Sequence, residues 1–125
     1  MQFLMLMIPG VYRDNKQPAG FTPDPEKIAA MGRFNEEFGQ AVKILSLNGL
    51  HPLQKGSRVS FAKDKPPTLT DGPFIETKEV LGGYWMVEAD SKEQLEQWAL
   101  RCPAEAGDII EIRQIFDLAD FAIKR

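Results

Sequence analysis

The sequence predicts an α+β fold, in which two helices cover a mostly antiparallel sheet. Three observations predict this class: two stretches with helical apolar spacing, several short β-prone runs around them, and a length of 125 residues that suits a single domain over residues 1–125. Hydrophobic residues make up 43% of the chain and charged residues 26%, as in ordinary globular proteins. A disordered or fibrous chain is therefore excluded.

The first half of the chain predicts a strand and then a helix. Residues 3–8 are continuously apolar up to Pro9, which is typical of a strand buried on both faces. Asp24, Pro25 and Glu26 together provide an N-cap, a first-turn proline and an acid near the helix N-terminus. The apolar stripe of this helix consists of Ile28, Met31, Phe34, Phe38 and Val42. Residues 44–47 could extend the helix or begin a strand, and periodicity alone does not decide between them.

The second half predicts a hairpin, a strand, a helix and a final strand. Residues 58–62 and 68–70 are short and β-prone around a turn, which indicates the hairpin. Residues 84–89 form a strand that is apolar on both faces, with one of Tyr84 and Trp85 under the helices and the other on the opposite face. Ser91 and Gln94 have the spacing of a capping box, and the helix they open is expected to run to Pro103. Residues 109–116 predict the last strand.

This order is a split βαβ pattern with an inserted β-hairpin, the ferredoxin-like plan. Both helices then cover one face of the sheet, and residues 3–8 and 84–89 form its central strands. An uncovered apolar face would promote aggregation. We therefore expect a homodimer that packs sheet to sheet.

Charge and cysteine content exclude several function classes. Fifteen Lys and Arg against eighteen Asp and Glu give a net charge of −3 without a basic run, so we expect no nucleic-acid partner. A single cysteine, Cys102, and a single histidine, His51, make a disulfide framework and a protein-only metal site improbable, and no cofactor is expected. Cys102 continues a helical stripe and is expected in the core. The absence of a leader or long apolar segment predicts a cytoplasmic protein without a membrane partner.

Residues 70–84, TDGPFIETKEVLGGY, resemble the signature of the DGPF family, which belongs to the YCII-related proteins of the dimeric α/β-barrel group. Residues 71–74, 76–79 and 81–83 follow the family order, and residues 98–103 look like its second-helix ending. The resemblance covers nearly the whole chain and implies a dimeric α/β-barrel, with residues 44–50 as a strand. Relatives often have Gly in place of Val42 and Gln in place of His51. Some members lie near or are fused to extracytoplasmic-function sigma factors, and a few YCII relatives are lyases or dehydrochlorinases with a His and Asp pair.

Asp71 and His51 are the candidate catalytic residues. Asp71 precedes Gly72-Pro73, where its carboxylate either accepts backbone hydrogen bonds in a tight turn or acts as a general base. His51 is either a residue at the surface end of a strand or a proton-transfer group, because its ordinary pKa of about 6.5 suits that task. A contact between the two would form the dyad of the YCII relatives.

Four further residues are candidate ligand-binding groups. Phe74 would provide an apolar wall, and Tyr84 would line a pocket from its central strand. Glu76 and Lys78 are separated by two positions and would clamp a polar ligand, or else form a solvated ion pair.

Three functions stay open from the sequence. The first is a small-molecule acid/base enzyme of lyase or isomerase type, with Asp71 as general base. The second is a non-catalytic module that binds a metabolite or a protein, as an accessory to an extracytoplasmic-function sigma factor. The third is a dimeric scaffold without a ligand.

Overall fold

The computed structural model describes residues 1–11, 24–72 and 80–121 of the chain. Its elements in chain order are β1 (Gln2–Ile8), α1 (Pro25–Ala41), β2 (Lys43–Gly49), the 3-10 helix η2 (Leu53–Lys55), β3 (Ser57–Ser60), β4 (Thr68–Asp71), β5 (Gly83–Glu88), α2 (Lys92–Ala99), β6 (Ile109–Gln114) and the 3-10 helix η3 (Leu118–Phe121). This succession confirms the predicted α+β, ferredoxin-like fold with an inserted hairpin.

The main sheet has four antiparallel strands in the order β2-β5-β1-β6 and is open. The two central strands are therefore β1 and β5, as predicted. Met5 lies opposite Trp85, and Leu6 lies opposite Tyr84. Since successive side chains of a strand point to opposite faces, these two pairs belong to different faces of the sheet.

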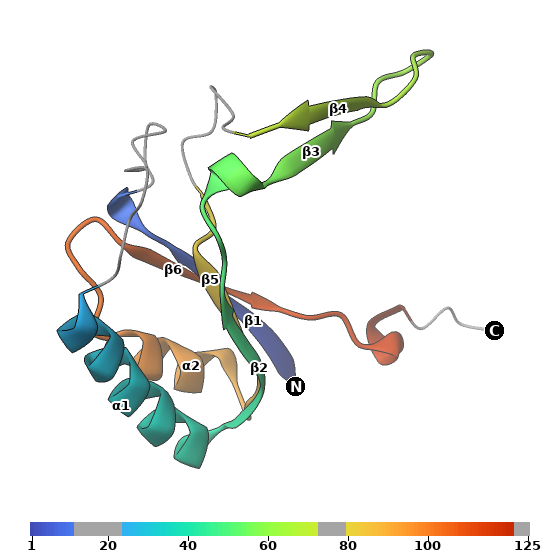
Figure 1. Ribbon diagram of the computed structural model, residues 1–125. Coiled ribbons are helices and arrows are strands. Elements are labelled where there is room, and N and C mark those ends of the chain that lie inside the picture. The colour runs from blue at the N-terminus through green and yellow to red at the C-terminus, as the bar shows by residue number, and fades with distance from the viewer. Residues whose placement is uncertain (12–23, 73–79, 122–125) are drawn as a thin grey trace.

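Both helices lie on one face of this sheet (Figure 1). Their contact with the sheet forms the core, which contains Phe3, Met5, Phe34, Phe38, Val42, Trp85, Val87, Ala89 and Leu95. The indole Nε1 of Trp85 donates a 2.8 Å hydrogen bond to Asn35 Oδ1 of α1, so the polar atom of this buried ring has a partner. Tyr84 thus falls on the other face, which we call the open face.

The helix caps follow the sequence pattern. Asp24 accepts a hydrogen bond from the Glu26 backbone N–H, and the Ser91 side chain accepts one from the Gln94 backbone N–H. The Gln94 side chain closes the box one residue early, because its Oε1 accepts from the N–H of Asp90. Each cap satisfies an N–H that the first helical turn leaves without a partner.

Some predicted boundaries and positions were wrong. Helix α2 ends at Ala99 rather than at Pro103, because Arg101 and Cys102 donate to carbonyls three residues back and tighten the chain into a turn. Strand β6 stops at Gln114, two residues short of the expected end. Ile28 is 57% exposed and does not belong to the buried stripe, since only Phe34 and Phe38 of α1 are fully buried.

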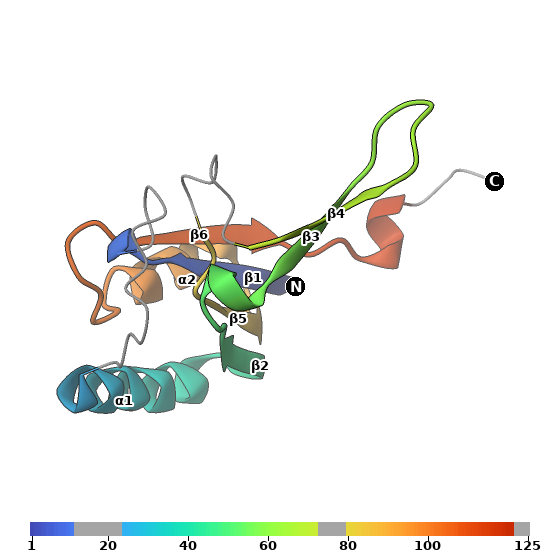
Figure 2. The same cartoon turned by 45° about the horizontal axis from the view of Figure 1, so that its top comes forward.

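Strands β3 and β4 form a separate two-stranded sheet, which we call the arm. All eight of their residues are exposed, and the arm projects away from the helices and the main sheet (Figures 1 and 2). Val59 lies opposite Leu69, so apolar side chains gather on one face of the arm. The candidate site lies at the foot of the arm, where η2 leads into β3.

Candidate small-molecule site

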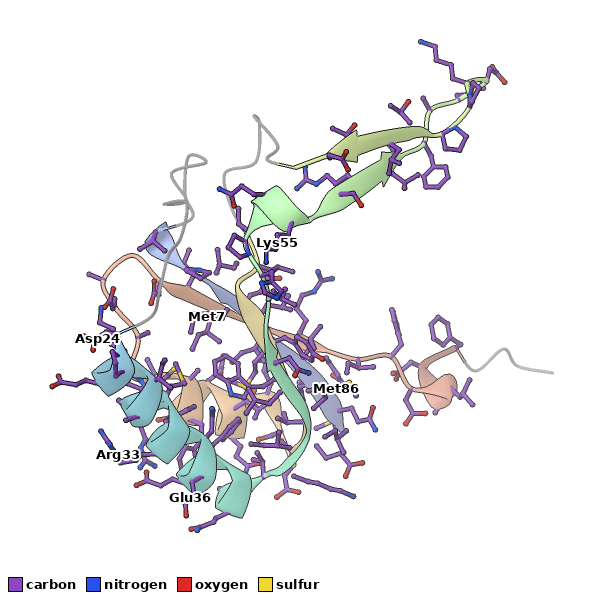
Figure 3. The ribbon with its side chains drawn as sticks, viewed as in Figure 1. Met7, Asp24, Arg33, Glu36, Lys55 and Met86 are labelled. Atoms are coloured by element: carbon purple, nitrogen blue, oxygen red, sulfur yellow. The ribbon has the colours of Figure 1, made fainter. Side chains whose placement is uncertain are left out.

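A hollow of about 550 Å³ lies at the foot of the arm, and we call it the basal hollow. Its lining comes from the segment after β2, from η2, from the start of β3 and from the residues that precede β5: Leu50, His51, Pro52, Leu53, Lys55, Gly56, Arg58, Val80 and Leu81. Figure 3 labels Lys55 at this foot of the arm. The hollow therefore lies where the arm joins the main sheet.

The Asp71-Gly72 turn fixes one wall of the basal hollow. The N–H of Gly72 donates a 2.9 Å hydrogen bond to the carbonyl of Gly56, the residue that follows η2. A Cβ on Gly72 would lie 1.9 Å from the Leu53 carbonyl oxygen, a separation no side chain could occupy. Only glycine thus lets the end of β4 approach η2 so closely, and this approach holds Leu53 and Lys55 in place.

The lining combines an apolar floor with cationic side chains. Lys55 and Arg58 carry positive charges, and His51 gains one when it is protonated. Among the described residues, neither Asp nor Glu lines the hollow. A small molecule with an anionic group and an apolar body fits this composition, because charge-assisted hydrogen bonds to a carboxylate or phosphate are about twice as strong as neutral ones.

The two residues of the predicted dyad, Asp71 and His51, lie on different segments of this site. Both residues are exposed. His51 lines the basal hollow, whereas Asp71 ends β4 opposite Ser57 and is not part of the lining. Between these two described residues the structure has neither a hydrogen bond nor an ion pair. The His and Asp pair stays a prediction, and the structural role of the turn belongs to Gly72.

Three predicted ligand-binding residues, Phe74, Glu76 and Lys78, lie outside the described residues. The segment that contains them leaves β4 at Gly72 and returns at Val80, which lines the basal hollow. Their roles stay predictions.

Tyr84 lies on the open face, within a small polar cluster. Its hydroxyl is 3.0 Å from Ser46 Oγ and receives a 2.9 Å hydrogen bond from Asn48 Nδ2. The hydrogen bonds with Ser46 and, second, with Asn48 lower the pKa of the Tyr84 phenol below its ordinary value, and desolvation opposes them. We call these three residues the tyrosine cluster; none of them lines the basal hollow.

Sequence reasoning missed Lys55, Arg58, Ser46 and Asn48. Ser46 and Asn48 alternate along β2, which places both side chains on one face, but the pairing of β2 with β5 was needed to bring them to Tyr84. Lys55 and Arg58 carry no local motif, since they meet His51 only through the η2 turn and the start of β3.

Cys102 is half-buried beside the core, with its Sγ 3.9 Å from the sulfur of Met31. Burial, and secondarily the charge of Asp108, raise the pKa of its thiol to about 11. In residues 1–11, 24–72 and 80–121, no group of three His, Cys, Asp or Glu side chains could hold a metal ion. No helix in these ranges has the length and apolar character needed to cross a membrane.

The fold and the site define a class: a ferredoxin-like α+β protein with an inserted arm, an open sheet face and a hollow at the foot of the arm. The family model of the YCII-related domain matches residues 1–119. The chain belongs to the YCII-related domain family, as its sequence signature predicted. A comparison with curated proteins gives no match.

Proposed function

We propose that this YCII-related protein binds a small molecule with an anionic group and an apolar body in the basal hollow, and that it carries out acid/base chemistry of lyase or isomerase type on it. One observation supports this most strongly: the only histidine of the chain lies with Lys55 and Arg58 over an apolar floor. In this proposal His51 transfers a proton and Lys55 binds the anionic group. Asp71, beside the turn that fixes η2, is the general base.

Binding is tested first, by thermal unfolding and calorimetry with benzoate, phenylacetate and phenol. A ligand of the native state raises the melting temperature. We expect the two carboxylates to bind more tightly than phenol, and Lys55→Gln to weaken them about tenfold because a charge-assisted hydrogen bond is lost. Lys65→Gln makes the same chemical change near the tip of the arm and serves as the control. Equal affinity in the two variants would exclude the basal hollow as the anion site.

Chemistry is tested next, on the compounds that bind. Asp71→Asn and His51→Gln should abolish turnover while the fold stays intact. Asp64→Asn is the matched control, since Asp64 has a φ of 62° and asparagine also adopts this left-handed conformation. Turnover that persists in Asp71→Asn ends the assignment of Asp71 as the base.

We also propose that a second copy of the chain covers the open face. Leu4, Leu6 and Met86 share this face, and none of them is fully exposed or fully buried. The arm adds Val59, Leu69 and Phe61, which are 53%, 69% and 79% exposed. A two-stranded ribbon is marginally stable alone in water, so a surface that the arm can pack against favours the dimer. Sedimentation of a monomer at micromolar concentration would refute it.

The exposed arm also favours the second candidate, a non-catalytic interaction module. An apolar protein surface such as that of a sigma factor could occupy the face that carries Val59 and Leu69. Co-purification with a sigma factor that is kept in Asp71→Asn and lost in Val59→Ser would favour this candidate over the enzyme.

A further inference from the structure

The tyrosine cluster is a second polar site, distinct from the basal hollow. Asn48 lies opposite Tyr84 and Ser46 opposite Met86, so β2 and β5 direct all three polar side chains of the cluster to the open face. Besides the two contacts to the phenol, Asn48 Nδ2 lies 3.3 Å from Ser46 Oγ. The three side chains therefore form a closed ring of hydrogen bonds.

Either hydroxyl can donate in the contact between Ser46 and Tyr84, and one of the two arrangements leaves the phenolic O–H for an external group. The amide nitrogen of Asn48 lies within hydrogen-bond distance of both Tyr84 and Ser46, whose oxygens are 3.0 Å apart, so one N–H group is shared between them. When the Ser46 hydroxyl donates to the phenol, the Tyr84 oxygen receives two hydrogen bonds. Its own O–H then has no acceptor among the described residues and can donate to a molecule above the open face.

The surroundings of the ring are apolar on one side. Leu6 lies across from Tyr84 on β1, and Met86 follows two residues along β5. Figure 3 labels Met86 beside the strands of the main sheet. The charged groups of this face form two ion pairs: Lys43 of β2 with Glu88 at the end of β5, and Arg113 with Glu111 on β6. Strand β6 lies two strand spacings from β5, or roughly 10 Å, so its charges stand apart from the ring.

We propose that the tyrosine cluster binds the enolate or phenolate oxygen of a flat, apolar small molecule, with Tyr84 as the hydrogen-bond donor and Leu6 and Met86 beneath the ring of that molecule. In the dimer proposed above, the molecule is held between the open faces of the two copies. A phenol that receives two hydrogen bonds is a stronger donor than a solvated one. The lowered pKa of Tyr84 is consistent with this polarisation. The site goes beyond the proposed function, because it needs neither His51 nor Lys55.

The test uses 4-nitrophenolate, whose absorption spectrum responds to a hydrogen bond at its oxygen, and the full chain. We expect Tyr84→Phe to weaken binding about tenfold or more, since a hydrogen bond to a charged group is lost. Ser60→Ala makes the same chemical change as Ser46→Ala on the exposed arm and should leave the affinity unchanged. Ser46→Ala and Asn48→Ala should each weaken binding less than Tyr84→Phe.

The outcomes separate this site from the basal hollow. If Tyr84→Phe loses 4-nitrophenolate binding and His51→Gln keeps it in full, the result supports the tyrosine cluster as the binding site, whatever ligands bind in the basal hollow. Loss in His51→Gln with full binding in Tyr84→Phe overturns it, because the probe then occupies the hollow. Absence of binding to the wild type overturns it as well.

A second measurement needs no ligand. In the Tyr12→Phe background, Tyr84 is the only tyrosine, and ultraviolet absorbance follows its ionisation directly. Adding Asn48→Ala should raise the midpoint of this titration toward the ordinary value for tyrosine. An unchanged midpoint would show that the hydrogen bonds of the tyrosine cluster do not polarise the phenol, and would overturn the proposal.

Discussion

Substitution of Gly72 by alanine should distort the basal hollow while it leaves the core intact. The new Cβ would lie 1.9 Å from the Leu53 carbonyl oxygen and 2.9 Å from its carbon. Ordinary contact begins at 3.4 Å, so the end of β4 and η2 must separate by about 1.5 Å. Both neighbours are backbone atoms, which cannot move aside as a flexible side chain would.

The energetic cost follows from the same contact. The separation breaks or lengthens the hydrogen bond from the Gly72 N–H to Gly56, which is worth about 1 kcal/mol. Because the arm lies outside the core, displacement of its foot relieves the clash without cavities among buried side chains. We expect the free energy of unfolding to fall by about 1 to 2 kcal/mol, and the affinity of benzoate for the hollow to fall about tenfold or more.

Calorimetric binding and denaturant unfolding measure the two effects, with Gly32→Ala as the control. Gly32 lies in α1, and a Cβ added there would meet no atom of another element within 4 Å. Alanine at this position should therefore stabilise the protein by about 0.5 to 1 kcal/mol and leave binding unchanged. Gly72→Ala that behaves like Gly32→Ala in both assays would refute the role given to the Asp71-Gly72 turn.

Three other predictions concern the core, a cap and the thiol. Phe38→Ala should cost about 3 to 5 kcal/mol in chemical unfolding, since Phe38 is 0% exposed and packs against Phe34 and Trp98; a loss below about 1 kcal/mol would contradict this packing. Ser91→Ala should cost about 1 kcal/mol through the lost cap of α2, whereas Ser60→Ala on the exposed arm should be near neutral in the same assay. The Cys102 thiol should react slowly with a disulfide reagent at neutral pH, because its pKa is raised to about 11 from 9.0. Since the folded pKa lies above the unfolded one, its contribution to stability is complete below about pH 9 and is lost as the pH rises toward 11; a Cys102→Ser variant should lack this alkaline loss.

The regular elements could be predicted from the sequence because their signals are local. Asp24 and Ser91 mark both helix starts. The alternation at residues 84 and 85 predicted that one of the two aromatic side chains lies under the helices, and the structure shows that it is Trp85. The family resemblance resolved the one ambiguity that periodicity left, at residues 44–47, which lie in β2.

The candidate sites could be predicted only in part, because they depend on approach between distant segments. His51 shares the hollow with Val80 and Leu81 from the segment before β5, and Tyr84 meets Ser46 through the pairing of strands 38 residues apart. Neither approach leaves a motif in the chain. The sequence drew attention to Asp71 rather than to Gly72. The close approach of Gly72 to the Leu53 carbonyl, which requires glycine, is visible only in three dimensions.

The arm gives the protein two levels of cooperativity. Within the described part of the chain, strands β3 and β4 pair only with each other, so we expect their amide protons to exchange through local opening, while those of β1 and β5 exchange only when the whole sheet unfolds. The basal hollow takes Arg58 and Gly56 from the arm and its foot, Leu50 from the segment after β2, and Leu81 from the segment before β5. One wall of the hollow therefore belongs to the arm, which opens locally, and the other belongs to the main sheet, which opens only on global unfolding. The hollow can then open and re-form many times while the core stays folded.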